Sequence, residues 1–152
     1  MIFLEVAQEF QTLISDELLI EAAEIALLQA QQDKTSSLSI KITSDQEIQE
    51  LNSSYRGLDK ATDVLSFPAD YYDPDLQTHY WGDVVISYTQ AAGQAESRGH
   101  PAISELQLLV IHGVLHLLGY DHGTAEEKRS MWTLQKQALE ALGLDIAVED
   151  GD

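Results

Sequence analysis

Three of the five histidines in this chain lie within eleven residues, between His112 and His122. His112 and His116 are four residues apart, so on a helix both side chains lie on one face, about 6 Å apart along the axis. Gly119 follows, and glycine permits the left-handed backbone conformation with which many helices end. The chain can then turn so that His122 reaches the same point. This pattern predicts a helix and a turn that bring three imidazoles together.

Three neutral imidazoles are a ligand set that suits zinc. They leave one tetrahedral position open, which is typical of catalytic rather than structural zinc sites. The spacing His-x3-His-x2-Gly-x2-His is also that of the zinc helix in metzincin proteases. We therefore predict one Zn²⁺ per chain, bound by His112, His116 and His122, in a hydrolase. The alternative is that these histidines pack, cap or face solvent independently.

Position 113 differs from the peptidase motif. The peptidases place a glutamate directly after the first histidine as general base, and this chain has Gly113. The sequence thus keeps the metal ligands without that base, which makes proteolysis a minor alternative. Acid–base help would have to come from another carboxylate, from the metal or from the substrate.

Composition indicates a cytoplasmic protein of one domain. A chain of 152 residues with 44% hydrophobic residues can form one sizeable core. It has no cysteine, its N-terminus lacks a basic signal-peptide region, and its longest apolar stretch, residues 108–111, is too short to span a membrane. We expect a single domain over residues 1–152, with an acidic tail from about residue 145, and no membrane association.

Hydrophobic periodicity predicts an α+β fold. Period-two patterns indicate strands, and apolar residues three or four apart indicate helices. Two capping boxes, Ser44 to Glu47 and Thr124 to Glu127, mark helix starts. We expect a small mixed sheet of about four strands packed with about five helices, including a metalloprotease-like zinc helix. The predicted strands are residues 2–6, 38–43, 64–67 and 84–86, the predicted helices are 15–32, 44–55, 88–97, 101–119 and 124–143, and residues 70–80 are predicted as a loop.

The net charge restricts the partners. The chain has 26 acidic and 8 basic residues, which gives a formal net charge of -18. Such a surface repels polyanions, so the protein cannot hold nucleic acid by general electrostatic attraction. Much of this charge is expected to be a solvated surface that keeps the protein soluble.

The segment from His112 to His122, His-Gly-Val-Leu-His-Leu-Leu-Gly-Tyr-Asp-His, resembles the signature of the YbeY endoribonucleases. Three further blocks match in the same order: residues 52–56, 62–68 and 82–87. The resemblance implies a metalloprotease-like fold and cleavage of single-stranded RNA. It also implies a role in small-subunit ribosomal RNA maturation and ribosome quality control, with the ribosome or a ribosome-associated protein as partner.

The resemblance further implies that Arg56 corresponds to the family's catalytic arginine. A guanidinium can bind a phosphate through two parallel hydrogen bonds and stabilise negative charge that develops on it. From the residues alone, a surface ion pair is the alternative. Lys60, in the same loop, could add a second phosphate contact or could simply be solvated.

Four other residues have open roles. Asp121 could accept a hydrogen bond from a ligand imidazole, or it could be a turn residue. Met131 could lie under the metal, although a core position on an amphipathic helix is favoured. His79 and His100 have no ligand-spaced partner and are expected at the surface or as capping residues.

Two other functions are compatible with a zinc site made of the three histidines. One is a zinc hydrolase of amide bonds, which would need a carboxylate base from outside the zinc helix. The other is a non-enzymatic ribosome-assembly factor with structural zinc, which would need a fourth protein ligand. The sequence offers no cysteine and no obvious further histidine for that position.

Overall fold

A mixed sheet of four strands forms one layer of the structure, a computed structural model that describes residues 1–32 and 35–146. The sheet order is β1-β2-β4-β3, in which β1, β2 and β4 are parallel and β3 is antiparallel to β4. The predicted α+β class with a four-stranded mixed sheet is confirmed. The strands are β1 (Ile2–Val6), β2 (Ser36–Thr43), β3 (Val64–Asp73) and β4 (Thr78–Ser87).

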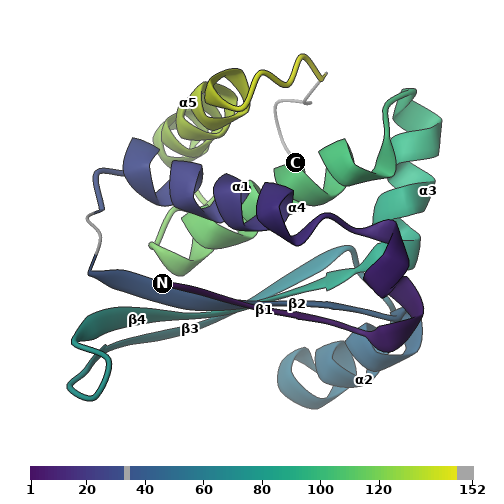
Figure 1. Cartoon of the computed structure of the whole chain (residues 1–152), viewed down its shortest axis with the longest axis horizontal. Coiled ribbons are helices and arrows are strands. Elements are labelled where there is room, and N and C mark those ends of the chain that lie inside the picture. The colour runs from purple at the N-terminus through teal and green to yellow at the C-terminus, as the bar shows by residue number, and fades with distance from the viewer. Residues whose placement is uncertain (33–34, 147–152) are drawn as a thin grey trace.

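Five α-helices and one short 3-10 helix make up the rest of the described chain. Figure 1 shows α1, α3, α4 and α5 on one face of the sheet and α2 on the opposite face. The 3-10 helix was not predicted. The helices are η1 (Gln8–Leu13), α1 (Asp16–Gln29), α2 (Asp45–Arg56), α3 (Tyr88–Arg98), α4 (Ala102–Leu117) and α5 (Ala125–Ala141).

Helix α4 is the centre of the helix layer. It packs against α1, α3 and α5, and against β3 and β4 on its sheet side. Leu106, Ile111 and Leu115 are fully buried, and most other residues of α4 are also inaccessible. A helix surrounded in this way has apolar residues on nearly every side. The polar residues of α4 are therefore exceptions that need a partner.

Gly113 is the point at which α4 lies closest to the sheet. A Cβ atom at this position would lie 2.5 Å from Cγ1 of Val84 on β4. The Ser66 hydroxyl on β3 donates a hydrogen bond to the Gly113 carbonyl oxygen at 3.1 Å. A side chain at position 113 would thus point into the sheet, so the place of the peptidase glutamate has no room for a carboxylate.

We predict that Gly113→Ala destabilises the protein. The added methyl group overpacks the contact with Val84, which costs about 1 to 3 kcal/mol in well-packed cores. Alanine's better helix propensity, worth about 1 kcal/mol, offsets part of this cost. Chemical denaturation would measure the net change in the free energy of unfolding.

The matched control is Gly93→Ala in α3. A Cβ atom at Gly93 would meet nothing within 4 Å, and the residue is exposed. Helix propensity then acts alone, so this substitution should stabilise the protein. Equal effects of the two substitutions would show that α4 does not press on the sheet.

The prediction of a loop over residues 70–80 was wrong. β3 continues to Asp73, β4 begins at Thr78, and the two form a long hairpin with a register shift between Pro68 and Tyr71. β3 is an edge strand, where a proline and exposed polar residues are tolerated. The acidic, proline-containing composition is therefore compatible with an edge hairpin as well as with a loop.

Both predicted capping residues are confirmed. Ser44 Oγ accepts a hydrogen bond from the backbone N–H of Glu47, and Thr124 Oγ1 accepts one from that of Glu127. The described part of the chain contains no helix long and apolar enough to cross a membrane. Most of the predicted acidic tail lies outside the described residues, and the single domain stays a prediction.

Candidate metal centre

The side chains of His112, His116 and His122 converge on one point. The Nε2 atoms of His112 and His116 are 3.1 Å apart, and those of His116 and His122 are 3.3 Å apart. One ligand atom from each residue lies within 4.8 Å of the other two. Zn–N bonds of about 2.0 to 2.1 Å in a tetrahedron place two ligand nitrogens about 3.3 Å apart. The three imidazoles thus fit a metal ion.

Local backbone geometry creates this convergence. His112 and His116 lie one turn apart on α4, which ends at Leu117. Gly119 then adopts a φ of 98°, the left-handed conformation that the sequence predicts. The turn brings His122 back to the helix face, just before Thr124 caps α5. A rigid helix therefore supplies two ligands, and the following turn supplies the third.

The environment keeps His116 uncharged. Burial lowers the pKa of His116 to about 4, and the neighbouring His112 and His122 act in the same direction. The Asp121 carboxylate and a hydrogen bond with the Tyr120 backbone oppose this effect. At neutral pH the His116 imidazole is therefore unprotonated, as a metal ligand must be.

One hydrogen-bond partner of His112 comes from α5. Oε1 of Gln135 lies 3.0 Å from Nδ1 of His112, and Gln135 is only 4% exposed. Asp121 instead accepts a hydrogen bond from the backbone N–H of His122. Of the two roles considered for Asp121, this contact supports the turn residue.

A cavity of about 220 Å³ adjoins His112. Residues from α3, α4 and α5 form most of its wall, and Asp63, which precedes β3, completes it. The Asp63 carboxylate accepts hydrogen bonds from the Gln94 side chain and from the Val64 backbone. The lining residues are Asp63, Gln94, Arg98, Glu105, Leu108, Leu109, His112 and Gln135.

The expectation that His100 is a surface or capping residue was wrong. Its side chain is 9% exposed, and its Nε2 lies 3.0 Å from Oε1 of the fully buried Glu105. Arg98 also donates to both oxygens of Glu105. The Arg98 guanidinium compensates the buried carboxylate, which would otherwise be costly to desolvate, and His100 gives it a further polar contact.

His79 and Met131 lie where the sequence suggested. His79 is partly exposed on the β3–β4 hairpin, where Nε2 lies 2.6 Å from the Asp70 carboxylate. Met131 is 2% exposed and belongs to the hydrophobic core. Neither belongs to the histidine cluster found among the described residues.

Arg56 is the last residue of α2 and is exposed. Helix α2 lies across the sheet from α4 (Figure 1), so the histidines and the arginine come from opposite layers. The segment after α2 leads within seven residues from Arg56 to Asp63 in the cavity beside His112. Lys60 is exposed on that segment. The contact of Arg56 with substrate stays a prediction.

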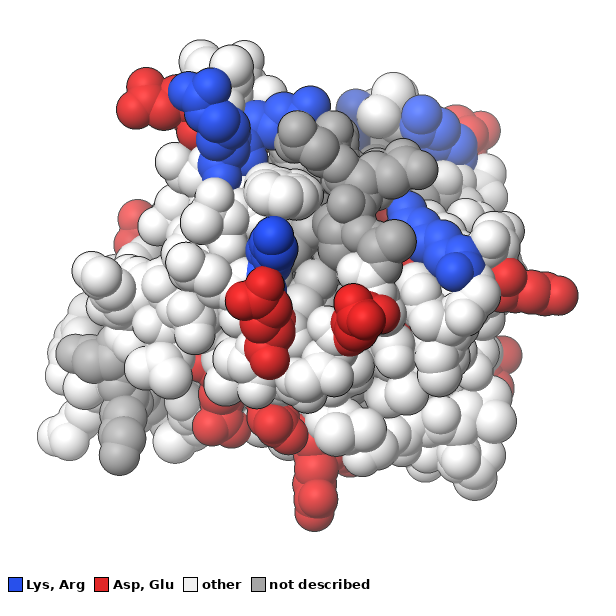
Figure 2. Space-filling view, turned by 90° about the horizontal axis from the view of Figure 1, so that it is seen from above, with Lys and Arg blue, Asp and Glu red and all other residues white. Residues whose placement is uncertain are grey.

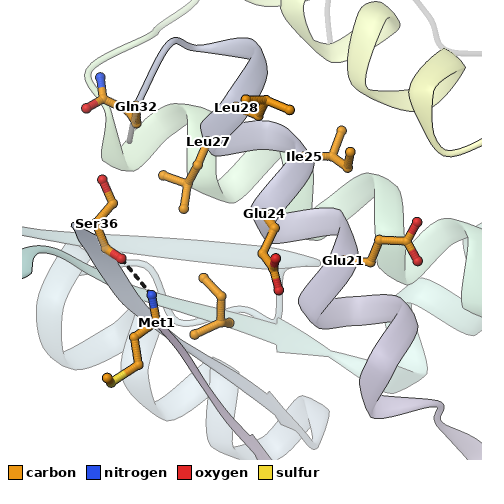
Figure 3. Close-up of a pocket in the computed structure, with 9 residues that line it drawn as sticks. Met1, Glu21, Glu24, Ile25, Leu27, Leu28, Gln32 and Ser36 are labelled. Atoms are coloured by element: carbon orange, nitrogen blue, oxygen red, sulfur yellow. Dashed lines mark hydrogen bonds between the residues drawn. The ribbon is translucent and has the colours of Figure 1, made fainter. Parts of the chain in front are cut away.

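A second hollow lies away from the histidines, between α1 and β1. It has a volume of about 550 Å³, and Figure 3 shows Leu27 and Glu24 reaching from α1 toward the N-terminal strand. Within this hollow, the N-terminal amine of Met1 donates a hydrogen bond to the Ser36 carbonyl oxygen at 2.7 Å. The described residues that line this groove include no histidine.

Comparison with known proteins identifies the family. The family model described as "Endoribonuclease YbeY" matches residues 4–143. The chain belongs to the YbeY endoribonuclease family. An endoribonuclease YbeY of Chloroflexus aurantiacus is 42% identical over 153 residues, covering 95% of this chain and 98% of that protein. One of Halalkalibacterium halodurans is 41% identical, covering 90% of this chain and 89% of that protein.

A solved structure has the same fold. The solution structure of TM1509 from Thermotoga maritima matches with a TM-score of 0.64 and 29% sequence identity. The match covers 93% of this chain and 89% of that protein. The YbeY resemblance recognised from the histidine segment therefore extends over nearly the whole chain.

Sequence reasoning missed Gln135 and the cavity beside His112. One signal for Gln135 was present, because it lies four residues after Met131 and three before Ala138, on the apolar face of a predicted helix. A polar residue on such a face needs a buried partner. No comparable signal relates Glu105 to Arg98 and His100, because their pairing depends on how α3 meets α4.

We predict that the protein binds one divalent metal ion and that His112→Ala, His116→Ala and His122→Ala each weaken binding. Two remaining imidazoles make a poor tetrahedral site. Elemental analysis and titration calorimetry with Zn²⁺ measure the stoichiometry and the affinity. His79→Ala is the matched control and should bind as the wild type does. Full binding by all three variants would refute the site.

Proposed function

We propose that this chain is a zinc-dependent endoribonuclease that cleaves single-stranded RNA during small-subunit ribosomal RNA maturation and ribosome quality control in the cytoplasm. His112, His116 and His122 hold one Zn²⁺, and Arg56 is the catalytic residue that contacts the scissile phosphate. The observation that carries this proposal is the convergence of the three histidines, with the Nε2 atom of His116 3.1 Å from that of His112 and 3.3 Å from that of His122. Membership of the YbeY family supports RNA as the substrate.

The donor set suits zinc and a catalytic role. Imidazole nitrogens are common zinc ligands, and the part of the chain that the structure describes adds no fourth His or carboxylate to this group. Zinc bound there would polarise the phosphate and lower the pKa of an attacking water or hydroxyl group. A structural zinc in a non-enzymatic assembly factor would need a closed coordination shell, so this alternative is less well supported.

Arg56 is suited to the phosphate. Its guanidinium is exposed at the end of α2 and stays charged at every physiological pH, so it can donate two hydrogen bonds to phosphate oxygens. Negative charge accumulates on these oxygens as the phosphorus becomes five-coordinate, and a fixed cation stabilises that charge. The histidines and the arginine thus have separate tasks.

Cleavage of amide bonds is the weaker enzymatic alternative. The peptidase base would occupy position 113, where a side chain would collide with Val84. Glu105, which is fully buried on α4, is held by Arg98 and His100. A carboxylate engaged in this way is poorly placed to take a proton from an attacking water.

Charge is unevenly distributed on the helix face. Among the described residues visible in Figure 2, Lys and Arg lie in the upper half of the view, and the lower half shows only acidic charged side chains. Helix α5 carries three basic side chains, Lys128, Arg129 and Lys136, and three acidic ones, Glu126, Glu127 and Glu140. The few basic side chains can contact a few phosphates, but the net charge of -18 repels a longer strand. We therefore propose that the ribosome or a ribosome-associated protein delivers the RNA.

We predict that Arg56→Ala lowers the rate of RNA cleavage by about two orders of magnitude while zinc content and fold are retained. Arg56→Lys keeps the charge but loses the paired hydrogen bonds, so its cleavage rate should lie between those of the wild type and Arg56→Ala. Single-turnover cleavage of a labelled single-stranded RNA measures the rates. A normal rate in Arg56→Ala at full zinc content would make Arg56 a surface residue.

We predict that naked single-stranded RNA binds weakly with a shallow salt dependence. About two to four phosphate contacts correspond to a slope of log K against log salt of about -1.5 to -3. Fluorescence titration across a salt series measures the slope, and cleavage should improve when the same RNA is presented in a ribosomal particle. Tight binding with a steep slope would contradict delivery by a partner and leave the metal site unaffected.

A further inference from the structure

We propose that Gln135 is a positioning residue that fixes the tautomer of His112, so that Nε2 of His112 presents its lone pair to the metal. This inference rests on the proposed metal site. It assigns a task to a side chain of α5 that takes no part in metal coordination and, on the proposed mechanism, does not contact substrate.

The contact between Gln135 and His112 is short and protected. Oε1 of Gln135 lies 3.0 Å from Nδ1 of His112, and the glutamine is 4% exposed. Gln135 lies on α5 between the buried residues Met131 and Ala138, and α5 packs on α4. The packing of α5 on α4 therefore holds the amide group against the imidazole.

Only one proton arrangement serves both nitrogens of His112. A neutral imidazole carries its proton on Nδ1 or on Nε2. Oε1 of Gln135 can only accept, so its contact requires the proton on Nδ1. Nε2 is then unprotonated and lies 3.1 Å from Nε2 of His116, at the centre of the candidate site. The opposite tautomer would place a proton where the metal binds.

The other two histidines have different contacts. The His116 imidazole has a hydrogen bond with the Tyr120 backbone, and the backbone N–H of His122 donates to the Asp121 carboxylate. Gln135 thus provides a side-chain anchor from a separate helix. It also couples the distance between α4 and α5 to the orientation of the first ligand, which a backbone contact within the turn cannot do.

Substituting Gln135 tests the proposal through metal affinity. Gln135→Met keeps the approximate volume and removes the acceptor, and removal of such a partner typically weakens metal binding by about 10- to 100-fold. Gln135→Glu restores an acceptor and should bind zinc at least as tightly as the wild type. Competition with a chromophoric chelator measures the dissociation constants, and circular dichroism monitors the fold.

The matched control is Gln137→Met on the same helix. Gln137 is exposed, so its substitution should leave zinc affinity unchanged. Weaker binding by Gln135→Met, recovered by Gln135→Glu and absent in Gln137→Met, supports a positioning role. Equal zinc affinity of Gln135→Met and the wild type would overturn it.

Nitrogen NMR of metal-free protein gives a second readout, because a merely structural role would not select a tautomer. At a pH where His112 is neutral, the wild type should show the proton on Nδ1, and Gln135→Met should show a mixture. A proton on Nε2 in the wild type would overturn the inference. Failure of the wild type to bind zinc would instead refute the proposed metal site, so the two failures are distinguishable.

Discussion

The contact between α4 and the sheet at Gly113 is the constraint on which the site depends. The absence of a side chain lets the helix backbone approach Val84, and the Ser66 hydroxyl holds the Gly113 carbonyl group from the neighbouring strand. His112 is the next residue toward the N-terminus, so this contact sets both the depth and the rotation of the first ligand. Position 113 thus supports the candidate metal site by packing, whereas a peptidase has its general base at this position.

The convergence of the three histidines could be predicted from the sequence because their geometry is local. A separation of four residues on a helix, followed by a glycine, determines where His112 and His116 point and how the chain turns. No knowledge of the tertiary structure is needed for that step. The same reasoning identified the two capping boxes and the order of most strands and helices, because hydrophobic periodicity and helix signals are also short-range.

The features that sequence reasoning missed depend on contacts between distant segments. Gln135 reaches His112 only because α5 folds back along α4, and Glu105 acquires Arg98 and His100 only where α3 meets α4. The β3–β4 hairpin was missed because an edge strand can be polar and contain proline, so its composition matches that of a loop. In each case the decisive information is which element lies beside another.

The three histidines span only eleven residues, and this has a consequence for how the protein and its ion come together. Helix α4, the Gly119 turn and the Thr124 cap already bring the ligands together, and the buried core is built from other side chains. Zinc fingers, by contrast, are unfolded without their metal. The hydrophobic core contains none of the three imidazoles. An ion bound by them would therefore contribute a smaller share of the free energy of folding than the metal of a zinc finger does.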